Sequence, residues 1–249
     1  MLGCQPDKHG SKVRQYIKML AAAPGAPLVV GCSAVSAQQI YVADAVRRTG
    51  RRGIVVVPRR KVRTAATEWA AAQGAEIVEA APGYRSVCMA RARAISLSLG
   101  ACVRWDRHGA VLDTAEQVSN LPAAAERIVV PTGSGLVAAG VLVGLALARR
   151  RTPVIACAVS PLAEEAEILM LARDLLGKAG AVWLPRFTFA RLPSRYERPI
   201  AARLPDGTPL DPYYAAKVLH YVHEGDLLWV TGRRPVAAMP REVVQDERV

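Results

Sequence analysis

The sequence predicts an α/β protein in which open, twisted and mainly parallel sheets carry helices on both faces. Two observations lead to this prediction. Short apolar runs alternate with amphipathic segments along most of the chain, and glycine or proline stands at many of the changes between them. The repeated order of strand, helix, glycine and strand is typical of βα units, whose strands pair in parallel.

Composition indicates a globular protein with a substantial core. The chain has 249 residues, of which 51% are hydrophobic and 22% are charged, so a disordered or fibrous chain is excluded. The five cysteines are scattered, with no CxxC pair and no histidine at ligand spacing. We therefore expect reduced thiols and no metal site. No segment has the pattern of a signal peptide or the length of a membrane helix, which predicts a cytoplasmic protein that does not contact membranes.

In the first half of the chain, an amphipathic stretch precedes three βα units. Each apolar run there ends at a small residue or a proline, and each helical stretch has apolar residues at helical spacing. Strands are predicted at 28–32, 53–58 and 75–80, and helices at 10–20, 37–48, 62–73 and 84–100. Residues 101–105 are strand-like, and residues 106–126 show only a weak pattern.

The second half begins with the clearest unit of the sequence, an apolar run, a glycine turn and a long apolar helix. Strands are predicted at 127–131, 153–160, 181–185 and 227–232, and helices at 136–150, 163–176 and 213–224. Residues 186–209 are predicted to be loop-rich, and the tail from residue 233 to be peripheral. The order of elements predicts a small αβ lobe at 45–105, inserted in a larger lobe made of 1–44 and 106–249.

The charge balance is unusually basic. The chain has 33 Lys and Arg against 21 Asp and Glu, a net charge of +12, and a pI near 10.0. Nearly all of the positive charge is arginine, which forms planar, bidentate contacts with phosphate or carboxylate. GC-rich coding explains why arginine replaces lysine, but it does not explain the net charge. A polyanion is therefore one expected partner.

One glycine turn is the strongest local signal for a binding site. Thr132-Gly133-Ser134-Gly135 follows a buried strand and opens a helix. Glycines there permit a tight turn, and the backbone N–H groups at the helix start form an anion cradle that suits a phosphate. A turn needed only for packing is the alternative. The spacing fits neither a Walker loop nor the full dinucleotide fingerprint, which disfavours a nicotinamide-dependent dehydrogenase.

Two further segments carry candidate functional groups. Lys12, in the sequence Gly10-Ser11-Lys12, begins the first helix and could be an imine-forming amine, or else a solvated lysine. Ser33, Ser36 and Gln38 follow a strand and open a helix. They could bind a substrate carboxylate, or they could only cap the helix.

Taken together and in order, these segments resemble the fold type II pyridoxal-phosphate enzymes, specifically the branch of D-cysteine desulfhydrase and aminocyclopropane-carboxylate deaminase. Gly10-Ser11-Lys12-Val13-Arg14 is similar to the family's Gly-Asn-Lys-x-Arg motif, and Gly31–Gln39 is similar to its serine-containing loop. Thr132–Gly135 matches the Thr-Gly-Ser-Gly phosphate loop. Leu210–Lys217 and Val230–Gly232 resemble the family's C-terminal Leu-Asp-Pro-x-Tyr-x-x-Lys and Thr-Gly motifs.

Three departures distinguish this chain from the family's pattern. Only eleven residues precede Lys12, fewer than the family usually has, which indicates a shortened member. Ala37 stands where the family has an asparagine after the loop serine. Ala215 stands where the family has a residue that can face the pyridine nitrogen, so the ring would be less stabilised here.

The resemblance implies a role for each motif. Lys12 would form the imine with pyridoxal 5'-phosphate, Thr132–Gly135 would hold the phosphate, and Thr231 would lie near the pyridine nitrogen. Tyr214 would line the ring or act as acid or base. Substrate would be bound by Ser33, Ser36 and Gln38, with Ser36 also assisting proton transfer.

The function implied is cleavage of a bond at the α-carbon of a small amino-acid-type substrate by a deaminase, lyase or decarboxylase, in a homodimer. Two alternatives stay open. The same chemistry could act on an amino-acid group attached to a DNA base, as in viral DNA hypermodification, which would account for the basic charge. The chain could instead be a non-catalytic relative that uses the fold to bind a ligand or a partner.

Overall fold

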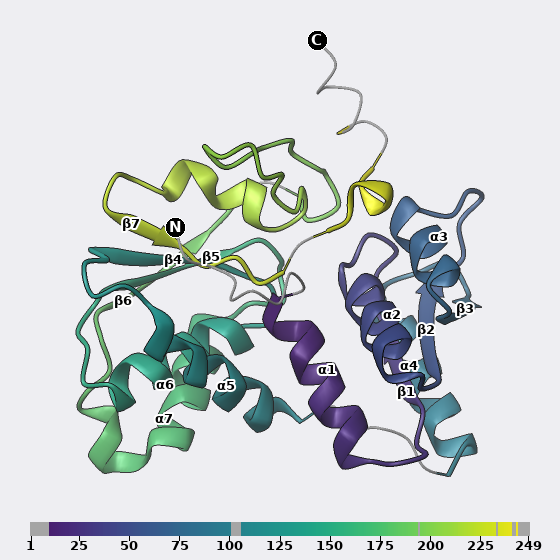
Figure 1. Cartoon of the computed structure of the whole chain (residues 1–249), viewed down its shortest axis with the longest axis horizontal. Helices are drawn as coiled ribbons and strands as arrows, with labels where there is room; N and C mark the ends of the chain where they lie inside the picture. Colours follow the sequence, from purple (N-terminus) through teal and green to yellow (C-terminus); the bar gives the residue numbers. More distant parts are fainter. Residues whose placement is uncertain (1–9, 101–105, 194, 233, 241–242, 244–249) are drawn as a thin grey trace. The chain divides into compact units, whose positions relative to one another are not determined.

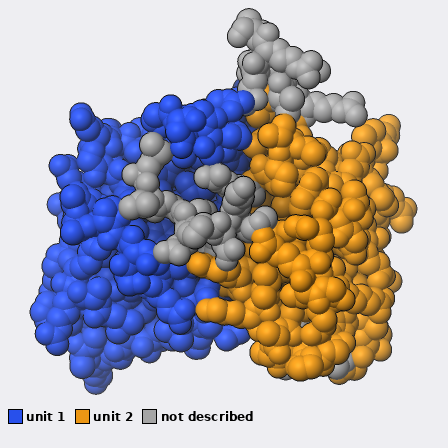
Figure 2. All heavy atoms as spheres, in the orientation of Figure 1, with its two compact units in different colours: residues 1–11, 106–233 blue, residues 12–105, 234–249 orange. Residues whose placement is uncertain are grey.

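The computed structural model describes residues 10–100, 106–193, 195–232, 234–240 and 243. The chain divides into two compact units, coloured separately in Figure 2. Unit 1 comprises residues 1–11 and 106–233, and unit 2 comprises residues 12–105 and 234–249. Each unit contains one parallel sheet.

The elements follow one another in βα order for most of the chain (Figure 1). Those of unit 2 are α1 (Gly10–Ala22), β1 (Leu28–Gly31), α2 (Gln38–Thr49), β2 (Gly53–Pro58), α3 (Ala65–Ala72), β3 (Glu76–Ala80), α4 (Arg85–Ser98) and the 3-10 helix η3 (Val236–Ala238). Those of unit 1 are α5 (Arg107–Glu116), η1 (Gln117–Asn120), β4 (Arg127–Thr132), α6 (Leu136–Leu147), β5 (Val154–Ala158), α7 (Glu165–Ala181), β6 (Phe187–Arg191), η2 (Ala215–Tyr221) and β7 (Asp226–Leu228).

Unit 2 is built on a parallel sheet of order β1-β2-β3. The central strand β2 is buried from Gly53 to Val57, because α4 covers one face of the sheet and α2 and α3 lie on the other side. Helix α4 approaches β1 very closely. A Cβ at Gly31 would meet the backbone oxygen of Cys88 at 2.4 Å, so no larger residue fits there.

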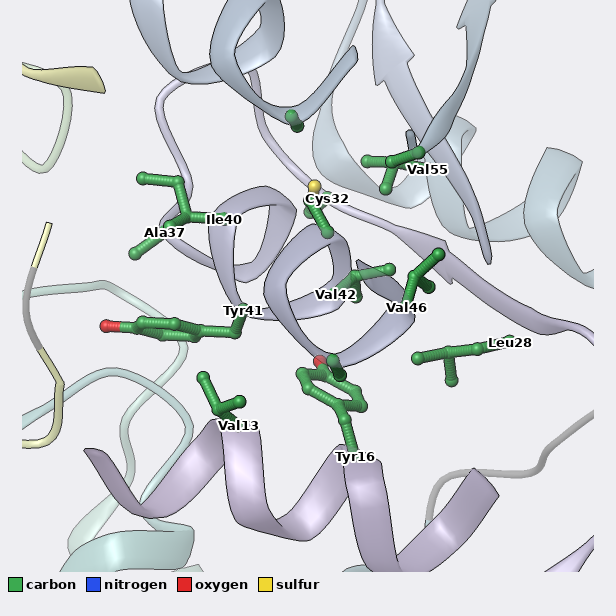
Figure 3. Close-up of a cluster of buried hydrophobic side chains, with 14 of the residues drawn as sticks. Val13, Tyr16, Leu28, Cys32, Ala37, Ile40, Tyr41, Val42, Val46 and Val55 are labelled. Atoms are coloured by element: carbon green, nitrogen blue, oxygen red, sulfur yellow. The ribbon is translucent and has the colours of Figure 1, made fainter. Parts of the chain in front are cut away.

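Helix α1 packs against α2 and belongs to the core of unit 2. Val13, Tyr16 and Leu20 are buried, and Figure 3 shows Val13 and Tyr16 directed at Tyr41 and the rest of α2. The segment 234–240 joins the same core through Ala238. Consequently 12–44 and 234–240 lie in unit 2, whereas the expected lobes grouped them with the larger part of the chain.

Unit 1 is built on a parallel sheet of order β6-β5-β4-β7. Helices α5, α6 and α7 lie on one face and η2 on the other (Figure 1). Helix α6 is buried from Leu136 to Ala146, because it lies between α5, α7 and the sheet. Two glycines make the contact with α5 possible. A Cβ at Gly140 would meet the carbonyl oxygen of Val111 at 2.7 Å, and one at Gly144 would meet that of Ala115 at 2.6 Å.

Most predicted strands and helices are confirmed within a few residues, and β2 has the bounds that were expected. Four expectations were wrong. The strand expected at 181–185 is the end of α7 and a turn, and the true edge strand β6 lies in the segment expected to be loops. The helix expected at 213–224 is the shorter η2. For the weakly patterned 106–126, where no element was predicted, the structure shows α5 and η1. The tail is not peripheral at 234–240, since Arg234 and Met239 are buried. The strand-like 101–105 lies outside the described residues.

Three of the five cysteines lie in the described part of the chain, and all three are buried free thiols. Burial raises the pKa of Cys32 and of Cys157 to about 12, which keeps both protonated at neutral pH. None of the described helices is long and apolar enough to cross a membrane.

Candidate functional site

The turn between β4 and α6 forms an anion cradle in unit 1. Gly135 precedes α6 in the left-handed region at φ 81°, which favours glycine. No described side chain caps this helix start, and its first turn carries no acidic residue. The N–H groups of the first turn and the positive end of the helix dipole are therefore available to an anion.

Both glycines of the turn are required by close neighbours. A Cβ at Gly133 would lie 1.6 Å from the hydroxyl oxygen of Tyr214, and one at Gly135 would lie 2.7 Å from Cγ1 of Ile168. The Tyr214 hydroxyl is thus held directly against the backbone of the turn. This contact brings together two segments that the sequence analysis singled out separately.

The two hydroxyls of the turn differ in their surroundings. Thr132 is buried, and its Oγ1 donates a hydrogen bond of 3.0 Å to the carbonyl oxygen of Val130. Ser134 is exposed. The side chain of Thr132 therefore holds the end of β4, and Ser134 is the hydroxyl that can reach a bound group.

Tyr214 is positioned by a buried lysine and a second tyrosine. The Lys217 side chain is 1% exposed, and its Nζ donates to the carbonyl oxygens of Arg195 at 2.6 Å and Tyr196 at 3.0 Å. The ring of Tyr196 meets that of Tyr214 edge to face, with 6.0 Å between centroids. Burial lowers the pKa of Lys217, although the nearby Asp211 raises it in part.

Thr231 lies at the same edge of the sheet as the glycine turn. Strand β7 pairs in parallel with β4, with Leu228 opposite Val129. Thr231 and Thr132 each come three residues after that pair, so Thr132 ends β4 and Thr231 lies beyond the carboxyl end of the neighbouring strand β7. Thr231 is buried there. Unit 1 therefore contributes Thr132–Gly135, Tyr214 and Thr231 from adjacent segments.

In unit 2, the segment between β1 and α2 carries the other candidates. Ser36 is buried, and its Oγ accepts a hydrogen bond of 3.2 Å from the backbone N–H of Gln38. Ser33 and Gln38 are partly buried. Ala37 precedes α2 and offers no capping side chain. The capping alternative for Ser36 is thus supported, and it does not exclude contact with a substrate.

Gln39 and Arg234 hold this segment in place, and the sequence analysis missed both. Nε2 of Gln39 donates to the carbonyl oxygens of Ala34 at 2.7 Å and Ser33 at 3.2 Å. Nη2 of the buried Arg234 donates to the carbonyl oxygen of Val35 at 2.9 Å. An amide within an apolar helical stretch was a usable signal for Gln39. No local signal could have found Arg234, which is 199 residues from Val35.

Lys12 lies near the start of α1 and is partly buried. One helical turn later, Tyr16 is fully buried. Burial raises the pKa of Tyr16 and Cys32 raises it further, whereas Arg85 and Gln38 lower it in part. Gln38 and Tyr16 are therefore close to each other, on the side of α1 that faces α2. Lys12, Ser33, Ser36 and Gln38 belong to unit 2, and that they share one site with the turn of unit 1 stays a prediction.

The described residues contain no group of three or more His, Cys, Asp or Glu that could hold a metal ion. The candidate groups are hydroxyls and the anion cradle in unit 1, and hydroxyls, amides and an amine in unit 2.

Comparison with known proteins identifies the fold. No protein-family model matches the chain, and no curated protein matches it in sequence. A structure described as an aminocyclopropane-carboxylate (ACC) deaminase homologue superposes with a TM-score of 0.71 at 17% identity, over 95% of this chain and 83% of the other. Threonine deaminase isoform 2 from Solanum lycopersicum superposes with a TM-score of 0.63 at 13% identity, over 95% of this chain and 74% of the other. A pyridoxal 5'-phosphate-dependent aspartate racemase superposes with a TM-score of 0.53 at 16% identity, over 90% of this chain and 80% of the other.

The chain has the fold of the fold type II pyridoxal-phosphate enzymes. The α/β class and the parallel sheets predicted from the sequence are confirmed. This fold type II architecture hosts deaminases and racemases among the similar structures, so the reaction of this chain must be argued from its own residues.

Proposed function

We propose that this chain is a pyridoxal-phosphate-dependent enzyme that breaks a bond at the α-carbon of an amino-acid-type substrate, as a deaminase or lyase. The observation that carries the proposal is the cradle at Thr132–Gly135. It combines an uncapped helix start, a left-handed Gly135 and a Gly133 closed over by Tyr214. A phosphate monoester fits such a cradle, because backbone N–H groups and the helix dipole both favour an anion.

Residues outside the cradle fit the remaining parts of the cofactor. Lys12, which is partly buried in the first helix of unit 2, would supply the amine. Tyr214 and Thr231 offer hydroxyls at the edge of the sheet that carries the cradle. Ala215 is buried and offers no acid toward a ring nitrogen, which favours reactions that need only modest electron withdrawal by the ring.

Each group has one task in the proposed mechanism. When bound, the cofactor supplies an electron-accepting ring that weakens bonds at the α-carbon of an amino acid. The N–H groups of the cradle bind its phosphate, and Lys12 supplies the amine that holds its carbonyl carbon. The Tyr214 hydroxyl, fixed against Gly133, holds or moves a proton at its oxygen. Ser36 and Gln38 bind the carboxylate of the substrate, helped by Ser33.

Absorbance and covalent labelling test the proposal. Purified protein is mixed with pyridoxal phosphate, reduced with borohydride and mapped by peptide mass spectrometry. We expect a visible absorbance band before reduction and a pyridoxyl group on Lys12 afterwards. Lys12→Ala should lose the band and all turnover of amino acids, whereas Lys178→Ala, at an exposed lysine of unit 1, should keep both. A Lys12→Ala enzyme with full activity would overturn the assignment.

Turnover separates an enzyme from a binding protein. If Lys12 is labelled but no small amino acid and no modified DNA is converted, the non-catalytic alternative replaces the proposal. Ala37 and Ala215 are the positions that would then explain the loss of activity.

A further inference from the structure

The net positive charge of the chain is concentrated in unit 2. Unit 2 contains eighteen Lys and Arg residues and seven Asp and Glu residues, which gives a net charge of +11. Unit 1 contains fifteen Lys and Arg residues and fourteen Asp and Glu residues, which gives a net charge of +1. Arginine itself is spread over both units, with fifteen in unit 2 and twelve in unit 1, so the difference comes mainly from acidic residues, of which unit 2 has half as many. Coding bias toward arginine does not account for this difference, and a net charge of +11 favours association of unit 2 with polyanions.

The densest basic segment is the connection from β2 to α3. Arg59, Arg60, Lys61 and Arg63 are all exposed within it. Arg63 pairs with Glu79 at 2.8 Å. Among the described residues, the side chains of Arg59 and Lys61 have no carboxylate within ion-pair distance, so their charge is open to solvent.

An exposed aromatic residue follows β3, the strand that pairs with β2. Strands β2 and β3 pair in parallel, with Pro58 opposite Ala80, and the N–H of Arg59 donates to the carbonyl oxygen of Ala80 at 2.9 Å. The segments that follow the two strands therefore lie at the same edge of the sheet. The second of them ends in Tyr84, whose side chain is 86% exposed. We call Arg59, Arg60, Lys61, Arg63 and Tyr84 the basic edge.

The basic edge is attached to the candidate substrate segment of the same unit. Oγ1 of Thr64 donates to the carbonyl oxygen of Ala34 at 2.7 Å. Oγ1 of Thr67 donates to Oε1 of Gln39 at 2.8 Å, and Gln39 in turn holds Ala34. A molecule bound along the basic edge would lie next to the Ser33–Gln38 segment.

We propose that the basic edge binds a nucleic-acid strand with unpaired bases. Arginine and lysine contact successive phosphates, and an exposed tyrosine gives a base a surface on which to stack. The run of three arginines in unit 1 differs. Arg149 and Arg151 stack on Trp183, and Arg150 donates to backbone carbonyl oxygens. Those arginines stabilise the fold, whereas Arg59 and Lys61 of the basic edge are exposed and have no carboxylate within ion-pair distance among the described residues.

Binding by the basic edge does not require the proposed function. If both hold, the strand lies beside the residues proposed to take the substrate, which favours an amino group carried on a nucleobase. The two proposals fail separately, because Lys12→Ala should lose cofactor labelling and still bind the strand as the natural chain does.

Fluorescence anisotropy with a labelled single-stranded oligonucleotide tests the proposal. The triple variant Arg59→Gln, Arg60→Gln, Lys61→Gln should bind about tenfold or more weakly at low salt, and the slope of log affinity against log salt should fall by about 2. The matched control removes the same charge at exposed sites of unit 1, through Arg173→Gln, Lys178→Gln and Arg186→Gln. It should bind within about threefold of the natural chain.

Tyr84 variants test whether bases are contacted. Tyr84→Ala should weaken binding of the single strand about fivefold or more and leave binding of inorganic polyphosphate unchanged, whereas Tyr84→Phe should behave as the natural chain. No binding at low salt, or equal losses in the two triple variants, would overturn the proposal. If Tyr84→Ala binds single strand, duplex and polyphosphate as the natural chain does, the surface recognises charge alone. That result would also overturn the proposal. Circular dichroism confirms that each variant is folded.

Discussion

Gly133 is the residue where backbone, side chain and proposed ligand meet. Gly133→Ala would push a methyl group into the Tyr214 hydroxyl, which lies 1.6 Å from the Cβ position. We expect the affinity for pyridoxal phosphate to fall about tenfold or more, because the turn must shift away from its anion-binding geometry. Absorbance titration measures the loss. Ser134→Ala, which keeps the backbone intact, should cost less, and an unchanged affinity in Gly133→Ala would contradict the cradle.

Lys217 is a buried amine whose ionisation opposes folding. Burial lowers its pKa below the ordinary value of 10.5. Between the folded and unfolded pKa values the unfolded chain binds more protons, so the unfolding free energy should rise with pH in that window. Lys217→Met should lack this rise. Urea unfolding of both chains at several pH values up to 10.5 measures it, and parallel curves for the two would refute the prediction.

At the scale of elements, one ion pair joins the starts of β4 and β7. Nη2 and Nε of Arg127 donate to the carboxylate of Asp226 at 2.5 and 3.1 Å, and the N–H of His223 donates to it at 2.8 Å. Burial raises the pKa of Asp226, but these hydrogen bonds outweigh it and hold the pKa below its ordinary value of 3.8.

This pair predicts a pH dependence of stability. The contribution of Asp226 is present above pH 3.8 and is lost as the pH falls through the lower folded value. Asp226→Asn should therefore lower the unfolding free energy by about 2 kcal/mol at neutral pH. The difference between the two chains should vanish in strong acid. A difference that persisted there would mean that the amide disturbs packing and not charge.

The contact between α5 and α6 depends on glycine. Gly140→Ala would place a methyl group 2.7 Å from the carbonyl oxygen of Val111, a backbone atom that cannot rotate away. We expect a loss of about 1–3 kcal/mol in stability, even though alanine favours helix. Gly180→Ala is the control, since its methyl would meet only the flexible Leu176 side chain at 3.0 Å. Thermal unfolding compares the two, and similar melting temperatures would contradict the packing argument.

An element could be predicted from the sequence where one or both of its faces are buried. The prediction was wrong where a run is apolar for another reason than burial in a sheet. Strand β2 is apolar because both faces are covered. The run at 181–185 is apolar for a different reason. Trp183 there stacks with Arg149 and Arg151. In η2 the consecutive residues Ala215–Val218 are all buried, so no periodic pattern could distinguish a 3-10 turn from an α-helix.

Across the whole molecule, the fold class could be predicted from the sequence. The segments of the candidate site could be singled out, but not the distant residues that contact them. The glycine turn has a local signature, because its shape follows from the strand, the glycines and the helix around it. The tyrosine that closes over Gly133 and the arginine that holds Val35 come from distant segments. Such contacts depend on how strands order themselves in a sheet, which no local pattern encodes.

The last described segment has a consequence for the order of events during synthesis. Residues 234–240 complete the core of unit 2, with Ala238 buried among side chains of the first part of the chain and η3 packed on α3. A ribosome makes this segment only after it has made every residue of unit 1. While unit 1 is translated, α3 of the nascent unit 2 therefore lacks its contact with η3. The core of unit 2 can thus be completed only after unit 1 has been translated.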